Sequence, residues 1–225
     1  MSAPLVVLVH GVWMPGGEMM FVKRHLANDH GFKGMLFSYP SVRGSLDENA
    51  QLLADFIDFL ELDEVHIVGH SLGGVVALRM LALFPDIAPG RVVCLGSPLC
   101  GSRAAHLLNK TDWGNSILGK SVVDGIVDEA ANEWASKVTE TREIGSIAGT
   151  VPMGLGRLVA KFREPSDGTV AVSETLLPGI KDHLTIDVSH SGLVLSTRVV
   201  NQTASFLKTG SFLQEPSQDP DESIA

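Results

Sequence analysis

The chain has 225 residues, a length that suits one domain with at most a modest insertion. Hydrophobic residues make up 44% and charged residues 19%, so a sizeable core can form and a globally disordered chain is excluded. The net charge of −9, without any large cluster of Lys or Arg, argues against a nucleic-acid-binding protein. No apolar run approaches the roughly 18 residues of a membrane-spanning helix and no secretory signal is recognisable, so we expect a soluble, cytoplasmic protein.

Short apolar runs alternate along the chain with stretches that have the periodicity of amphipathic helices. The first run, Leu5-Val-Val-Leu-Val9, is rich in valine and stops at His10-Gly11, as expected of a buried strand that ends in a turn. Strands that alternate with helices pair in parallel and carry helices on both faces. The sequence therefore predicts an α/β fold with a doubly wound, mostly parallel sheet. Further strands are expected at residues 33–39, 64–69, 91–96, 143–148 and 180–188, and helices at 17–28, 46–60, 73–84 and 193–207.

Two segments depart from this alternation. Residues 101–142 form an insertion of about forty residues between two strands, a length typical of a cap or lid, although a peripheral helix pair without a functional role is the alternative. Residues 209–225 are acidic and interrupted by proline, so we expect no fixed structure there. The predicted domain covers residues 1–208.

The strongest motif is Gly69-His70-Ser71-Leu72-Gly73, which lies between a β-branched strand and a helix. A serine on such a sharp turn adopts strained backbone angles, and bulky side chains two residues away on either side would collide. The turn raises Oγ above the sheet, over the positive end of the following helix. This context predicts that Ser71 is a nucleophile.

A serine needs a base to take its proton, and His190 is the best of the eight histidines. It follows the strand that ends near Val188 and precedes the last helix, so it lies at the same sheet edge as Ser71. The other seven are expected to bond backbone in turns (His10, His70), to be solvated (His25, His30, His106), to lie in a strand (His66) or to enter one (His183).

The base in turn needs an acid that fixes its tautomer, and Asp167 is the best candidate. It stands in a loop in Ser166-Asp167-Gly168-Thr169-Val170 and gives the chain order Ser, Asp, His. Asp187 and Asp182 are weaker rivals. The oxyanion that forms on attack needs two backbone donors, which we expect from Leu72 and from Val12.

With these pieces the chain resembles the α/β-hydrolase superfamily, and most of all its small esterase/lipase branch. The resemblance covers residues 4–208 and rests on His10-Gly11, the Gly69–Gly74 elbow, the Asp167 loop and Ser189-His190. It implies a doubly wound sheet of about six parallel strands. It also implies that Ser71, Asp167 and His190 are a catalytic triad, with Val12 and Leu72 as the oxyanion pair.

Three features differ from larger or secreted relatives. We expect the chain to lack their N-terminal antiparallel strands and their export signal, and no acidic constellation matches their calcium site. We therefore expect no metal and no cofactor. Cys94 and Cys100 are expected to be ordinary buried thiols, a disulfide or metal pair being the alternative.

An apolar acyl group is the expected specificity. Trp13 and Met14 lie on the loop that carries Val12, while Leu99 and Leu193 follow strand ends, so these four are predicted to contact substrate. The resulting prediction is a serine hydrolase of carboxylic esters that acts on a small-molecule or lipid-like substrate. Thioester hydrolysis or acyl transfer by the same triad, and a non-catalytic binding protein on the same fold, are the alternatives. The oligomeric state stays open.

Overall fold

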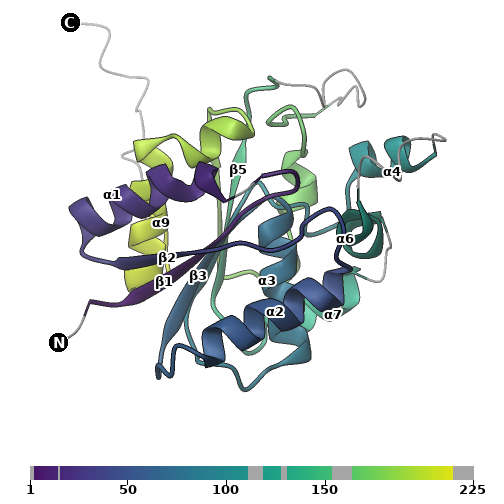
Figure 1. Cartoon of the computed structure of the whole chain (residues 1–225). Helices are drawn as coiled ribbons and strands as arrows, with labels where there is room; N and C mark the ends of the chain where they lie inside the picture. Colours follow the sequence, from purple (N-terminus) through teal and green to yellow (C-terminus); the bar gives the residue numbers. More distant parts are fainter. Residues whose placement is uncertain (1–2, 15, 111–118, 128–130, 154–163, 215–225) are drawn as a thin grey trace, which may run out of the picture.

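In the computed structural model, which describes residues 3–14, 16–110, 119–127, 131–153 and 164–214, a parallel sheet forms the centre of the molecule (Figure 1). Within these residues it has six strands in the order β2-β1-β3-β4-β5-β6. The chain runs from β1 outward to β2 and then back across to β3, so β1 and β3 flank a topological switch point. The strands are β1 (Leu5–Val9), β2 (Lys33–Phe37), β3 (Val65–His70), β4 (Val92–Leu95), β5 (Ile144–Gly149) and β6 (Asp182–Ile186).

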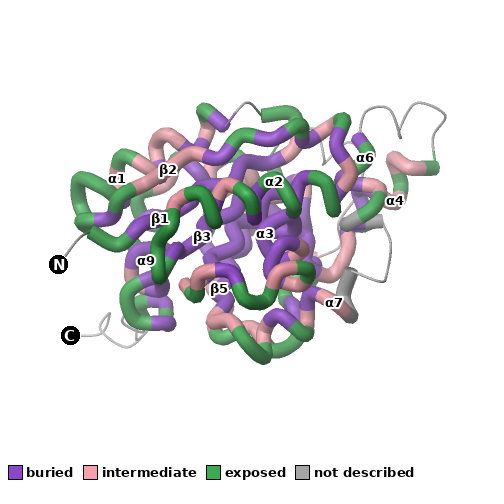
Figure 2. The backbone as a smooth tube through the Cα atoms, turned by 60° about the horizontal axis from the view of Figure 1, so that its bottom comes forward, coloured by how far each residue is buried: buried purple, intermediate pink, exposed green. Residues whose placement is uncertain are grey.

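The predicted α/β fold with a doubly wound, parallel sheet is confirmed. Every residue of β1, β3, β4 and β5 is buried, because helices cover both faces of these strands (Figure 2). The strands at the two sheet edges, β2 and β6, are partly exposed. Continuous apolar runs were therefore a sound guide to the central strands.

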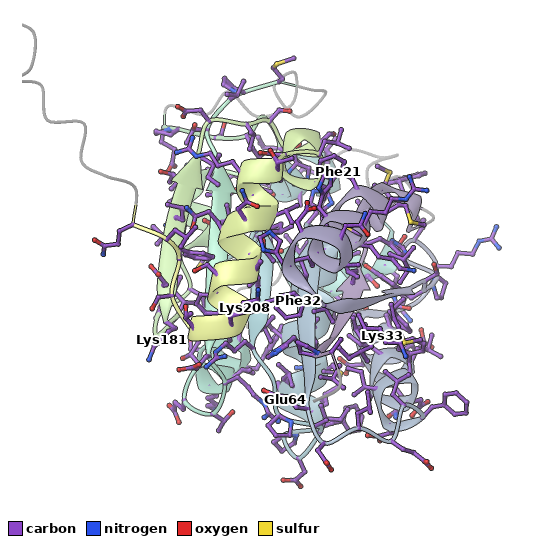
Figure 3. All side chains as sticks on the ribbon, turned by 90° about the vertical axis from the view of Figure 1, so that its left-hand side faces the viewer. Phe21, Phe32, Lys33, Glu64, Lys181 and Lys208 are labelled. Atoms are coloured by element: carbon purple, nitrogen blue, oxygen red, sulfur yellow. The ribbon has the colours of Figure 1, made fainter. Side chains whose placement is uncertain are left out.

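Helices cover both faces of the sheet (Figure 1). On one face Phe206 and Leu26 anchor an apolar cluster, and Leu53 and Met80 anchor its counterpart on the opposite face. Lys208 lies over the ring of Phe32, 5.5 Å from its centroid, and so ties the end of the last helix to the start of β2 (Figure 3). The first face carries α1 (Met20–His30) and α9 (Thr197–Thr209), and the second carries α2 (Leu46–Asp58), α3 (Leu72–Leu83) and α7 (Ala131–Val138).

The last helix is shorter than its apolar pattern indicated. The expected helix over residues 193–207 is split into a 3₁₀ turn, η4 (Ser191–Val194), and α9, which starts at Thr197. The reason is Ser196, which is extended and accepts a hydrogen bond from the Val199 N–H as a helix cap. Two further 3₁₀ turns are η1 (Gly17–Met19), which leads into α1, and η3 (Val172–Thr175).

The expected insertion at residues 101–142 has two parts. Its end, α7, is the crossover helix between the parallel strands β4 and β5: Ala135 and Val138 are buried, and Arg79 of α3 lies over the Trp134 ring at 5.2 Å. Ser121 fixes an earlier part to α2 by accepting from Asn49 Nδ2 at 2.7 Å. The described pieces of this earlier part are α4 (Arg103–Asn109), α6 (Lys120–Val122) and the π-helical turn η2 (Val123–Val127).

The expected unstructured segment, residues 209–225, begins with ordered residues. The ring of Phe212 packs on Phe206 with centroids 5.0 Å apart, and its N–H donates to Asp182 Oδ2 at 2.8 Å. The Leu213 N–H donates to Gln202 Oε1 at 2.7 Å. One aromatic contact and two backbone hydrogen bonds thus hold this part on the domain, while residues 215–225 lie outside the described residues.

Candidate active site

Ser71 occupies the strained turn that the sequence predicted. Its backbone angles are φ 53° and ψ −122°, an unfavourable region for a residue with a side chain. A Cβ atom at Gly69 would lie 2.5 Å from the Gly74 backbone, and one at Gly73 would lie 2.3 Å from the Val9 carbonyl oxygen. The elbow therefore packs so closely on itself and on β1 that only glycine fits at these two positions.

Neighbouring strand ends hold the elbow at the carboxyl edge of the sheet. The Ser71 N–H donates to the Leu95 carbonyl at the end of β4, at 2.9 Å. On the other side, a Cβ atom at Gly11 would come within 3.1 Å of the Ser71 Cβ, so the loop after β1 lies against the serine. Ser71 thus lies at the switch point between β1 and β3, where ligands of such sheets usually bind.

His190 and Asp167 form the second half of the site. His190 Nδ1 lies 2.7 Å from Asp167 Oδ2, and the other carboxylate oxygen accepts the N–H groups of Thr169 and Val170, both at 2.8 Å. Asp167 is 1% exposed, so its charge is stabilised by these donors and not by solvent. The rival acid Asp187 is exposed and accepts a hydrogen bond from Thr150 Oγ1 instead.

The end of β4 brings this pair toward the serine. Gly96, which follows Leu95, has φ +56°, and a Cβ atom there would meet Asp167 Oδ2 at 3.0 Å and His190 Nδ1 at 3.2 Å. The three residues predicted as a triad therefore surround one strand end. Among the described residues, Ser71 Oγ makes no hydrogen bond in this structure, and the only ring nitrogen of His190 that makes one is Nδ1.

The two residues predicted as oxyanion donors lie on the backbone after Ser71 and after Gly11, the glycine that approaches the serine. Leu72 is the first residue of α3, so its N–H has no acceptor within the helix and lies at the positive end of the helix dipole. Val12 follows Gly11 on the loop after β1, and the next residue, Trp13, has an unusual φ of 67°. The Gly11 N–H is held by Glu18 Oε1 at 3.1 Å.

The four residues expected to contact substrate differ in exposure. Trp13 and Met14 are 56% and 38% exposed on the loop after β1. Leu99 and Leu193 are 3% and 0% exposed, and Leu193 packs beneath Gly96. As the structure stands, these two leucines belong to the core and offer almost no surface to a ligand.

The remaining histidines and the cysteines have other partners. His10 stacks on Tyr39 and its Nδ1 lies 2.7 Å from the Gly11 carbonyl, while His70 Nε2 lies 3.2 Å from the His190 carbonyl. Both therefore contact backbone, as expected for turn residues. Cys94 and Cys100 are free thiols, and burial raises the pKa of Cys94 to about 12, which makes it unreactive.

Neither a metal cluster nor a membrane span is evident in the described part of the chain. No group of three or more His, Cys, Asp or Glu side chains there could hold a metal ion. No described helix has the length and apolar character needed to cross a bilayer.

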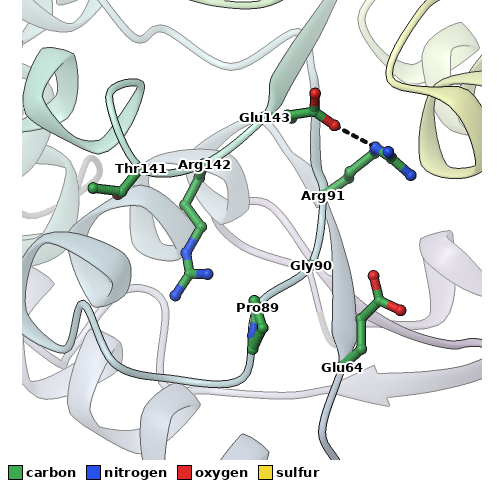
Figure 4. A pocket seen from close by; sticks show the side chains of 7 residues that line it. All are labelled: Glu64, Pro89, Gly90, Arg91, Thr141, Arg142 and Glu143. Carbon is green, nitrogen blue, oxygen red and sulfur yellow. Dashed lines mark hydrogen bonds and ion pairs between the residues drawn. The ribbon is translucent and has the colours of Figure 1, made fainter.

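A cleft of about 430 Å³ lies at the opposite edge of the sheet, before the starts of β3, β4 and β5 (Figure 4). Its arginines are engaged by the protein itself: Arg91 Nε donates to Glu143 at 2.6 Å, and Arg142 donates to the carbonyls of Pro85 and Ile87. Because Ser71 lies at the carboxyl edge, this cleft is not part of the site built around it.

Comparison with known proteins agrees with this arrangement. A sequence model described as the alpha/beta hydrolase family matches residues 6–185. The structure of the lipase BlEst2 from Bacillus licheniformis is similar, with a TM-score of 0.71 and 18% identity, covering 94% of this chain and 93% of that one. An esterase from Exiguobacterium antarcticum gives a TM-score of 0.67 at 15% identity, covering 92% and 93% of the two chains. At such identities the likeness establishes the fold alone.

The curated relatives share shorter stretches. Esterase YbfF from Escherichia coli (strain K12) is 28% identical over 93 residues, which are 36% of this chain and 34% of that protein. The stretches shared with the curated relatives span no more than about a third of those relatives' lengths.

Proposed function

We propose that this chain, which belongs to the alpha/beta hydrolase family, is a serine hydrolase that cleaves carboxylic esters with an apolar acyl group. Membership rests on the family match over residues 6–185, most of the chain. The observation that carries the proposal is the pairing of His190 with the buried carboxylate of Asp167, beside a strained serine turn. A protein that only bound ligands would have no need of this combination.

In the first half of the reaction, Ser71 Oγ attacks the ester carbonyl carbon while His190 Nε2 takes its proton. Nδ1 is bonded to Asp167, so Nε2 is the atom left for the serine, and the imidazolium that forms is stabilised by the carboxylate. The hydrogen bond between Ser71 Oγ and His190 Nε2 is expected to form when substrate is bound, since such catalytic contacts are often long or misaligned in free enzymes. The N–H groups of Val12 and Leu72 hold the oxyanion.

In the second half, His190 gives the proton to the leaving alcohol, and the acyl group stays on Ser71 as an ester. A water molecule then loses a proton to His190 and attacks this acyl-enzyme. Collapse of the second tetrahedral intermediate releases the carboxylic acid and returns the proton to Ser71. Proton and charge are balanced over the cycle, and no cofactor is needed.

The acyl group is assigned to the loop after β1. Trp13 and Met14 present exposed apolar surface next to the proposed oxyanion donor Val12. Leu99 and Leu193, being buried, are assigned the support of this wall. Methionine and tryptophan adapt to chains of several lengths, so apolarity is a firmer expectation than length.

The cytoplasm is the proposed location. Cys94 and Cys100 are both free, which is the usual state of thiols in a reducing compartment. Detection of the protein in the soluble cytoplasmic fraction of its host would support this assignment, and its recovery outside the cytoplasm would contradict it.

The test is hydrolysis of p-nitrophenyl esters from C2 to C16 by the wild type, Ser71→Ala and the control Ser205→Ala, which alters a helix far from the site. Ser71→Ala should lower kcat on the order of 10⁶-fold, and the control should match the wild type. A fluorophosphonate probe should label Ser71 only where the triad is intact. Labelling without hydrolysis of any ester would favour acyl transfer or a special substrate. Neither labelling nor hydrolysis would overturn the proposal in favour of a binding protein.

A further inference from the structure

Two buried ionisable side chains beside the site have no part in the reaction steps above. The Glu18 and His70 side chains are only 7% and 5% exposed, and Glu18 Oε1 lies 3.8 Å from His70 Nδ1. Within the described residues, Glu18 Oε2 and His70 Nδ1 have no hydrogen-bond partner. A buried carboxylate with one bare oxygen is expensive in free energy, and apolar side chains of similar volume are often as stabilising or more so. A contribution to the stability of the fold therefore does not explain why this buried pair is present.

Each member of the pair contacts a different part of the site. Glu18 Oε1 accepts the Gly11 N–H at 3.1 Å, and Gly11 precedes the proposed oxyanion donor Val12. His70 is bonded covalently to Ser71, and its Nε2 lies 3.2 Å from the His190 carbonyl. The pair thus connects the loop after β1 to the backbone of His190, the proposed base.

The contact with His190 determines the tautomer of His70. A carbonyl oxygen only accepts, so His70 Nε2 carries the proton and donates it. Burial lowers the pKa of His70 and the neighbouring His190 acts in the same direction, while Glu18 opposes both. His70 is therefore neutral near pH 7, with its lone pair on Nδ1 facing Glu18.

A neutral His70 suits the chemistry proposed for His190. The two rings are 4.8 Å apart, and the His190 ring becomes positively charged during attack. A second cation at that distance would oppose this charge. Burial raises the pKa of Glu18, and the hydrogen bond that the Gly11 N–H donates to its carboxylate opposes this effect.

We propose that Glu18 and His70 are positioning residues for the triad, an inference that rests on the proposed function. Glu18 fixes the turn that carries Val12 by accepting the Gly11 N–H. His70 holds the His190 carbonyl, so that the imidazole keeps its place above Ser71. Neither side chain touches the reacting atoms.

Matched variants of His70 distinguish the effect of its Nε2–H hydrogen bond from the effect of the side chain's volume. His70→Gln keeps an N–H near the position of Nε2, whereas His70→Leu removes it at similar volume. The Leu variant should lower kcat for p-nitrophenyl esters about 10- to 100-fold with little change in KM, because a misplaced base affects the transition state and not substrate binding. The Gln variant should recover most of the lost kcat. His25→Gln, an exposed histidine bonded to Asp29, is the control and should match the wild type.

Glu18 is tested in the same way. Glu18→Gln keeps an oxygen that can accept the Gly11 N–H, and Glu18→Met does not. The Met variant should lower kcat about 10- to 100-fold while the protein stays folded at the assay temperature, because removal of the buried charge offsets part of the cost of leaving the Gly11 N–H unpaired. The Gln variant should keep most of the activity. A purely structural role would instead make loss of activity follow loss of Tm.

The outcomes keep this inference apart from the proposed function. A wild type that hydrolyses no ester and resists the fluorophosphonate probe would overturn the proposed function and the inference with it. An active wild type with Leu and Met variants within twofold of its kcat would overturn the inference alone. Activity losses that parallel lower Tm values, with no recovery by either Gln variant, would overturn it as well.

Discussion

His190 and Asp167 are bonded to each other through both side chain and backbone. The His190 Nδ1 atom lies 2.7 Å from Asp167 Oδ2, and the His190 N–H donates to the Asp167 carbonyl at 3.0 Å. The other carboxylate oxygen accepts two backbone N–H groups of its own loop. The aspartate therefore cannot rotate without breaking several bonds, and the position of the imidazole is fixed even before substrate arrives.

This geometry predicts the effect of Asp167→Asn. The asparagine carbonyl would stay on the Thr169 and Val170 N–H groups, so its amide nitrogen would face His190 Nδ1. Nδ1 must then accept, the ring proton moves to Nε2, and Nε2 can no longer take the proton of Ser71. We expect kcat for p-nitrophenyl esters to fall about 10³- to 10⁴-fold. The control Asp187→Asn, at the exposed rival position, should stay within twofold; a loss of less than tenfold in Asp167→Asn would contradict the assignment.

Gly73→Ala should destabilise the folded protein and not only lower its catalytic rate. The added Cβ would lie 2.3 Å from the Val9 carbonyl oxygen, and both atoms belong to backbone that cannot move independently. We expect the free energy of unfolding, measured by urea denaturation, to fall by about 3 kcal/mol or more. Gly17→Ala is the matched control, because nothing lies within 4 Å of its added Cβ. Equal urea midpoints for the two variants would show that the close packing is wrong.

Phe212→Ala tests whether the end of the described chain stabilises the domain. Phe212 is 7% exposed against Phe206, whereas Phe59 on the opposite side of the fold is 83% exposed. Phe212→Ala should cost about 3 kcal/mol in urea denaturation, and Phe59→Ala less than about 0.5 kcal/mol. If the two variants were equally stable, the contact with Phe206 would be absent in solution.

Hydrophobic periodicity and the expectation of parallel pairing predicted most of the fold and the grouping of the candidate site. The β-branched runs gave the buried strands, and parallel pairing of those strands put the loops of Ser71, Asp167 and His190 at one edge. Asp187 gives the same chain order, so the preference for Asp167 rests on its place in a separate loop, whereas Asp187 lies only three residues before His190. Asp167 and His190 then come into contact because their two loops both pack against Gly96.

Other features depend on packing that no local pattern encodes. The parallel pairing of β4 and β5 needs a crossover connection, and α7 provides it, although residues 101–142 as a whole were predicted to be a cap insertion. Leu193 follows a strand and was predicted to contact substrate, but its side chain packs against Gly96 and is fully buried. The Glu18–His70 pair joins residues 52 positions apart, through the meeting of a loop after β1 with the elbow after β3.

The stability of the protein should fall as pH decreases from 7 to 5. Burial lowers the pKa of His66, His70 and His183 from the ordinary value of 6.5. Below about pH 6.5 the unfolded chain therefore binds more protons than the folded protein, and acid favours unfolding by up to about 1.4 kcal/mol per pH unit for each histidine. The carboxylates with lowered pKa act in the same direction but only nearer pH 4.5, so the range from 7 to 5 isolates the histidines.

His66 offers the most direct test of whether buried histidines cause the loss of stability in acid. Its Nδ1 accepts the Arg91 N–H at 2.9 Å and so must be unprotonated, with Arg91 adding to the effect of burial and Glu64 opposing it. In His66→Asn the amide oxygen can accept the same N–H but cannot take up a proton. Urea midpoints measured at pH 5, 6, 7 and 8 should therefore fall less steeply with acid in His66→Asn than in the wild type, and the two should converge toward pH 5. An unchanged slope would mean that His66 is not one of the groups that take up protons on unfolding.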